Sequence, residues 1–146
     1  MRLRAVAVSL LALGLAACGS DSLSASQLRD TTAKVCAAAD RSTDQIPTPT
    51  TPKEGLDYLR RGVAALIPEL NQLRALHPPS DLAGQYDTAV DAIAREIRAL
   101  QNGMKGLKAG GDPVVEIKTL QHHLAPLESK ADRAWASADI RGCTSR

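Results

Sequence analysis

Apolar side chains recur every three or four residues through three long stretches of the sequence, 56–73, 82–107 and 117–138. This spacing places them on one face of an α-helix, whereas a half-buried strand would alternate at every second residue. The middle stretch is the most regular, with apolar positions at Leu82, Tyr86, Val90, Ile93, Ile97, Leu100, Met104 and Leu107. A fourth, shorter stretch carries Leu28, Val35, Cys36 and Ala39 on one face. The repeat predicts an all-α protein with four amphipathic helices.

Local signals mark where these helices should begin and end. The expected caps are Ser24, with Gln27 completing a capping box, then Thr51, Ser80 or Asp81, and Asp112. The expected ends are at about Arg41, at His77-Pro78-Pro79, at Ala109-Gly110-Gly111 and at Gly142. Every connector then has ten residues or fewer, which favours antiparallel neighbours. We therefore expect residues 24–146 to form an antiparallel up-down four-helix bundle.

Two prolines lie inside the expected helices. Pro68 interrupts the stretch 56–73 and Pro126 the stretch 117–138, yet the helical phase of the apolar residues continues through both. A proline inside a helix removes one hydrogen bond and bends the axis. We expect two kinked helices, and a gap between them could admit a small apolar molecule. The alternative is that the kinks only accommodate packing.

The N-terminus has the three parts of an export signal. Arg2 and Arg4 precede an apolar run that ends at Leu15-Ala16-Ala17-Cys18, and polar residues follow at once. The run is shorter than the roughly 20 apolar residues of a membrane-spanning helix. These features resemble the lipobox of bacterial lipoprotein precursors. The resemblance implies cleavage of residues 1–17, a diacylglycerol on Cys18, and residues 18–23 as a lipidated tether. The alternative is an ordinary signal peptide whose cleavage site includes a cysteine.

If lipid occupies Cys18, the remaining cysteines are Cys36 and Cys143. A disulfide between them is the economical assignment in an oxidising compartment; a redox or metal-binding pair is the alternative. The bundle raises a difficulty, since Cys36 lies about 18 Å along the first helix from Ser24. We expect the connector 42–51 to let the first helix slide along the bundle until the two cysteines meet.

Little in the sequence indicates catalysis. Loss of Arg2 and Arg4 with the signal would leave equal numbers of basic and acidic residues, and aromatic residues are few, which argues against nucleic-acid binding. His122 and His123 should lie on the outer side of the fourth helix, diverging by about 100°. Haem held by Met104 and a histidine is the remaining cofactor alternative. The carboxylates are expected away from the apolar faces. We predict no enzyme, no metal and no cofactor.

The remainder of the chain loosely resembles small, alanine-rich helical lipoproteins of high-GC bacteria. The residues that carry this resemblance are Cys36, the segment Leu76-His77-Pro78-Pro79, and Gly142-Cys143. The resemblance implies no activity. The leading hypothesis is a lipid-anchored, extracytoplasmic module of the cell envelope that contacts a partner protein or has a structural role. The alternative is a carrier or sensor of a small apolar ligand bound between the kinked helices.

Overall fold

The structure is a computed structural model, and it describes residues 22–144. Within this range the chain forms four α-helices, two short 3-10 helices and no strand: α1 (Ala25–Asp44), η1 (Pro52–Glu54), α2 (Gly55–Arg74), α3 (Ala83–Lys108), α4 (Pro113–Ser137) and η2 (Arg141–Cys143). The all-helical prediction is confirmed. The expected signal peptide and Cys18 lie outside the described residues. None of the helices in this range combines the length and the apolar character needed to cross a membrane.

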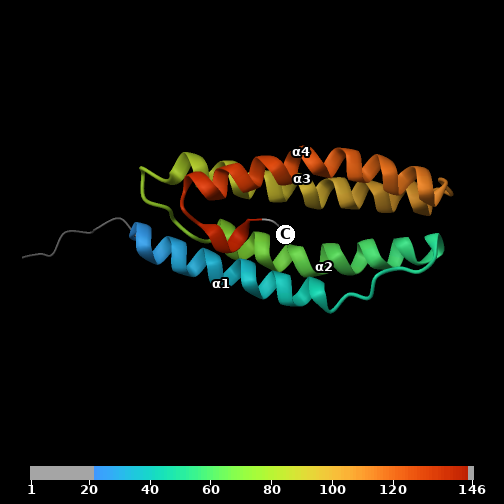
Figure 1. Cartoon of the computed structure of the whole chain (residues 1–146), viewed down its shortest axis with the longest axis horizontal. Helices are drawn as coiled ribbons and strands as arrows, with labels where there is room; N and C mark the ends of the chain where they lie inside the picture. The colour runs from blue at the N-terminus through green and yellow to red at the C-terminus, as the bar shows by residue number, and fades with distance from the viewer. Residues whose placement is uncertain (1–21, 145–146) are drawn as a thin grey trace, which may run out of the picture.

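Successive helices lie side by side along one long axis and alternate in direction (Figure 1). α1 packs against α2, α2 against α3, and α3 against α4, with the most extensive contact between α3 and α4. After α4 the chain turns back towards the middle of the molecule (Figure 1). There η2 packs on α1 and also touches α4, so the C-terminal segment lies between the first and the last helix.

The largest fully buried side chain among the described residues is that of the single tryptophan. Trp135 is fully buried, and Tyr86 meets it edge-on with ring centroids 5.5 Å apart. The Tyr86 hydroxyl donates a 2.8 Å hydrogen bond to the backbone carbonyl of Leu73, so this phenol joins α3 to the last turn of α2. Leu28 of α1 and Ile140 beyond α4 are also inaccessible to solvent. Burying an aliphatic side chain of this size contributes roughly 1.5–3 kcal/mol.

Three of the expected helix ends are confirmed. The Ser24 side chain accepts from the Gln27 backbone N–H at 3.2 Å and the Gln27 side chain accepts from Ser24, which completes the capping box. Asp112 caps α4 by accepting from the first two free N–H groups, at 2.9 and 3.1 Å. Gly110 adopts φ +87° directly after α3, a conformation that favours glycine. These local signals therefore fix the start of α1, the end of α3 and the start of α4.

The expected caps of α2 and α3 are wrong. Residues 52–54 form a 3-10 turn that leads into α2, so Thr51 does not cap the helix. Instead the Glu54 carboxylate accepts from the Thr50 backbone N–H at 2.8 Å, and this hydrogen bond lowers the pKa of Glu54. α3 begins after Leu82, and no side chain caps its first turn. Residues 80–81 form a turn that leads directly into the helix, so neither Ser80 nor Asp81 is its cap.

The predicted end of the fourth helix is also wrong. α4 ends at Ser137, not at Gly142, because Asp139 takes a left-handed backbone conformation with φ +58°. The next N–H group, that of Ile140, donates back to the Trp135 carbonyl at 2.9 Å, the bond that closes a Schellman-type helix end. The Arg29 side chain of α1 donates to the Ala138 carbonyl at 3.0 Å and so holds the turn against α1.

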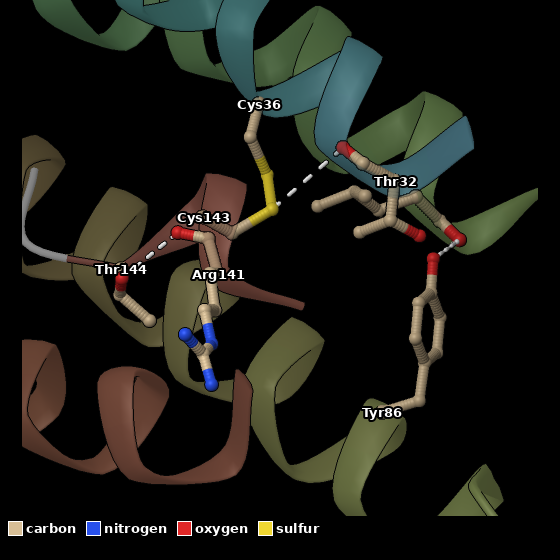
Figure 2. The surroundings of a disulfide bond; sticks show 7 residues. Thr32, Cys36, Tyr86, Arg141, Cys143 and Thr144 are labelled. Atoms are coloured by element: carbon tan, nitrogen blue, oxygen red, sulfur yellow. Dashed lines mark hydrogen bonds between the residues drawn. A yellow bond between two sulfur atoms is a disulfide. The ribbon is translucent and has the colours of Figure 1, made fainter. Parts of the chain in front are cut away.

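This reversal brings the two cysteines together. Cys36 and Cys143 form a disulfide with their Cα atoms 5.3 Å apart, and both are buried, so the predicted pairing is confirmed (Figure 2). The expected sliding of the first helix is not needed, because the chain folds back and carries Cys143 to α1 as part of η2. Gly142 allows η2 to approach α1 closely, because a Cβ atom at that position would lie 2.9 Å from the Ala33 side chain.

Candidate functional site

A cavity of about 320 Å³ lies between the four helices and borders the disulfide at Cys143. All four helices contribute to its wall, and Cys143 of η2 forms part of it. Much of the lining is apolar and comes from the helix faces that the sequence repeat identified: Leu59, Leu66, Ile93, Leu100, Leu124 and Ala131. A cavity of this size and composition falls in the range of small-molecule sites.

Carboxylates from every helix reach the same cavity. Asp40 comes from α1, Glu69 from α2, Glu96 from α3, and Glu128 and Asp132 from α4. Among the described residues that line the cavity there is no lysine, arginine or histidine. Like charges that share a partly enclosed space repel one another more strongly than they would in water. The described lining is therefore acidic as well as apolar.

These carboxylates extend from the surface into the interior. Glu128 is exposed, whereas Asp40, Glu96 and Asp132 are half-buried. Glu69 is only 2% exposed, and its Oε2 atom and the Oε1 atom of Glu96 are inaccessible to solvent. Burial of an ionised carboxylate is costly unless a cation or hydrogen-bond donors compensate it. The carboxyl groups thus extend from the exposed rim of the cavity to its buried part.

The expectation that carboxylates lie away from the apolar faces is wrong for Glu69 and Glu96. Each of them follows one apolar position by three residues and precedes another by four: Leu66 and Leu73 for Glu69, Ile93 and Leu100 for Glu96. Such spacing places a side chain on the same helix face as its apolar neighbours. The sequence thus contained a signal for these two residues, and the missing information was which helices face one another around the cavity.

The two prolines lie close to this site in sequence, but on the outside of the molecule. α2 continues through Pro68 and α4 continues through Pro126, as predicted, and both prolines are exposed. Pro68 directly precedes the buried Glu69. Neither proline belongs to the lining of the acidic cavity, and the structure does not bring the two together at one site. The bend of each helix stays a prediction.

Pro126 instead lines a groove of about 530 Å³ between α3 and α4. Arg95, Arg98 and His123 also border this groove, with Leu120 among its apolar residues. Its character is therefore the opposite of the acidic cavity, since most of its charged groups are basic. The predicted gap between the two kinked helices stays a prediction, because this groove borders Pro126 and not Pro68.

The acidic cavity offers binding groups and little reactive chemistry. Among residues 22–144, no group of three or more histidine, cysteine, aspartate or glutamate side chains is placed to hold a metal ion. The cysteine at the cavity wall, Cys143, is held in the disulfide. His122 and His123 lie exposed on α4, with ring centroids 6.2 Å apart, and do not line it. The arrangement places acidic and apolar side chains around one partly enclosed space.

Comparisons with known protein families, with curated proteins and with solved structures find no match to this chain.

Proposed function

We propose that the protein is a lipid-anchored module of the cell envelope that faces the extracytoplasmic side and acts by contact with another protein. The observation that carries the proposal is the buried Cys36–Cys143 disulfide, which joins residues 107 positions apart. Disulfides of this kind form and persist in oxidising compartments. The chain has three cysteines, so this pairing leaves Cys18, the cysteine of the lipobox, for attachment of a lipid.

On this proposal, residues 1–17 are a cleaved signal peptide, 18–23 are the lipidated tether, and 24–146 are an antiparallel up-down four-helix bundle. The six tether residues can span at most about 20 Å, which keeps the start of α1 close to the membrane. α4 has 25 residues and is therefore about 37 Å long. It begins at the end of the molecule opposite the start of α1 (Figure 1). That far end is the part of the domain most accessible to a partner.

Two adjacent apolar residues are exposed at the far end. Val114 and Val115, in the first turn of α4, keep 49% and 60% of their surface in solvent. Exposed apolar side chains are common on protein surfaces when they occur singly, and adjacent ones at an accessible end are suitable positions to probe for a partner. Ser137 provides the matched control, because it is exposed at the opposite end of the same helix.

The experiment separates anchoring from partner contact. The first measurement is fractionation of cells that express the wild type or Cys18→Ser, and we expect the substitution to move the protein out of the membrane fraction. The second places a photo-crosslinking amino acid at position 115 or at position 137 of the intact protein. We expect a discrete protein adduct from position 115 that is absent from position 137. Membrane retention of Cys18→Ser would refute the anchor, and equal labelling at both positions would refute a partner at the far end.

A second candidate function, a ligand carrier or sensor, is favoured by the acid-lined cavity. Its carboxyl groups modify the expectation of a purely apolar ligand, because acidic side chains from all four helices line the cavity beside the apolar ones. A molecule with a cationic group and a small apolar body matches the lining better. Native mass spectrometry of the exported protein tests this candidate. A retained non-protein mass that Glu69→Gln abolishes would support it, and a bare protein would count against it.

A further inference from the structure

The connector between α1 and α2 is rich in threonine and proline. Residues 45–52 read Gln-Ile-Pro-Thr-Pro-Thr-Thr-Pro. Threonine or serine combined with proline is the composition of segments that carry O-linked sugars, because the prolines keep the hydroxyl groups on an extended, solvated backbone. We infer that Thr48, in the middle of this connector, is an O-glycosylation site. The inference rests on the proposed extracytoplasmic location and adds a covalent modification to it.

The backbone at Thr48 is extended and accessible. Residues 47–49 belong to no helix, and the connector lies outside the four helices (Figure 1). Pro49 disfavours the helical conformation of the residue before it, so Thr48 is restricted to extended backbone conformations. Among residues 22–144, no partner accepts a hydrogen bond from the backbone N–H group of Thr48. The segment 47–49 can therefore enter the binding groove of an enzyme without breaking a hydrogen bond of the described fold.

The hydroxyl group of Thr48 differs from those of the two threonines that follow it. Thr48 is exposed, and its hydroxyl forms no hydrogen bond within the described part of the chain. The Thr50 hydroxyl instead donates to the Glu54 carboxylate, at 3.3 Å to the nearer oxygen. The Thr50 backbone N–H and, to a smaller degree, the Thr51 side chain also bind this carboxylate, and both lower the pKa of Glu54. A transferase would have to open this turn to reach Thr50 or Thr51, whereas Thr48 is free to react.

The modification is a glycosyl transfer with a sugar phosphate ester as the donor. The Oγ1 atom of Thr48 attacks the anomeric carbon of the donor and forms a new carbon–oxygen bond. The bond between that carbon and the phosphate oxygen breaks, and the phosphate leaves with the electron pair. The hydroxyl proton passes to a base of the transferase. The product is a sugar joined to Thr48 by an ether-type oxygen, with no change in the charge of the protein.

Intact-mass measurement of the full-length protein, purified from its natural host, tests the inference. We expect the wild type to carry the added mass of one or more whole sugar residues, and Thr48→Ala to lose that mass. Thr50→Ala is the matched control, because Thr50 is also exposed and also follows a proline, but its hydroxyl is bound to Glu54. It should keep the sugar. Absence of a sugar from the wild type, a phosphate in its place, or loss of the sugar from Thr50→Ala alone would overturn the inference.

Two further measurements test why Thr48 is the residue that accepts the sugar. Glu54→Ala removes the hydrogen bonds that hold Thr50 and Thr51, so we expect the fraction of protein with a sugar on Thr50 to rise several-fold in fragment mass spectra. An unchanged fraction would refute the role of these hydrogen bonds. Thr119 is exposed as well, but it lies within α4. We expect no sugar there, and equal modification of Thr119 would refute the role of the extended connector.

The export signal and the lipidated cysteine separate this inference from the membrane anchor. Cys18→Ser keeps residues 1–17, so we expect it to carry the sugar on Thr48 even if fractionation refutes the anchor. Deletion of residues 2–17 removes the signal, and we expect the sugar to be lost. A sugar on Thr48 in that deletion variant would overturn transfer after export. A membrane-bound wild type without a sugar would overturn the inference alone, and the anchor would stand.

Discussion

Removal of the Cys36–Cys143 disulfide should cost this protein a large share of its stability. The bridge joins residues 107 positions apart, so in the unfolded chain it closes a long loop and removes many conformations. The chain-entropy relation for a loop of 107 residues gives about 4.8 kcal/mol at 25 °C. Domains of this size have total unfolding free energies of roughly 5–15 kcal/mol. The double variant Cys36→Ala, Cys143→Ala should therefore retain between almost none of that stability, at the lower limit, and about two thirds of it, at the upper limit.

Urea unfolding followed by two probes measures the effect. Far-ultraviolet circular dichroism reports the helices, and Trp135, the single tryptophan, reports the core beside η2 by its fluorescence. We expect a lower midpoint with a steeper slope, because the unfolded chain without the bridge exposes more surface. In a thermal scan the loss should appear as a decrease of about 15–25 °C in Tm. Cys18→Ala is the control. A loss below about 1 kcal/mol would refute the loop-entropy reasoning.

Three further predictions concern single residues. Burial raises the pKa of Tyr86 from its ordinary value of 10 to about 12, so the folded protein favours the neutral phenol. The stability that Tyr86 contributes in this way is fully present below pH 10 and should fall by about 2–3 kcal/mol between pH 10 and 12. Unfolding measured at several pH values should show this loss in the wild type and not in Tyr86→Phe. Gly142→Ala should lower the free energy of unfolding by about 1–3 kcal/mol, because the new Cβ atom would lie 2.9 Å from the Ala33 side chain. Gly62→Ala should raise the free energy of unfolding by about 0.5–1 kcal/mol, because its Cβ atom would have no atom within 4 Å and alanine favours the helix. Urea unfolding measures both effects. Asp112→Ala removes two hydrogen bonds at the start of α4 and should cost about 1 kcal/mol by thermal unfolding.

Much of the helical architecture could be predicted because its determinants are local. Helical periodicity and a capping box at Ser24 act within a few residues, and they locate α1 and its partners without knowledge of the rest of the fold. The end of α4 has no such signal. Asp139 adopts a left-handed conformation that glycine would adopt more readily, and the adjacent Ile140 becomes buried. Tertiary packing of Ile140 and the contact of Arg29 with Ala138 stabilise that turn, and neither can be read from local sequence.

The acidic cavity could likewise be predicted only in part from the sequence. The positions of Glu69 and Glu96 on the apolar faces follow from spacing alone, and the sequence could have indicated them. Their convergence with Asp132 could not be predicted, because it depends on the register of three helices against one another. The sequence allowed us to predict which cysteines form the disulfide, but not how the chain brings them together. An even number of remaining cysteines indicated which residues join, whereas the reversal that brings Cys143 to α1 depends on the turn at Asp139.

The disulfide also determines how the molecule would respond to a mechanical load. A pull between the start of α1 and the C-terminus runs along α1 to Cys36, crosses the sulfur bridge to Cys143, and leaves through the last residues of the chain. α2, α3 and α4 all lie within the covalent ring closed by the bridge, and no tension passes through them. Stretching the chain by its ends would extend only the first half of α1 and the short segments outside the ring, while the helices that form the core and the cavity remain unloaded.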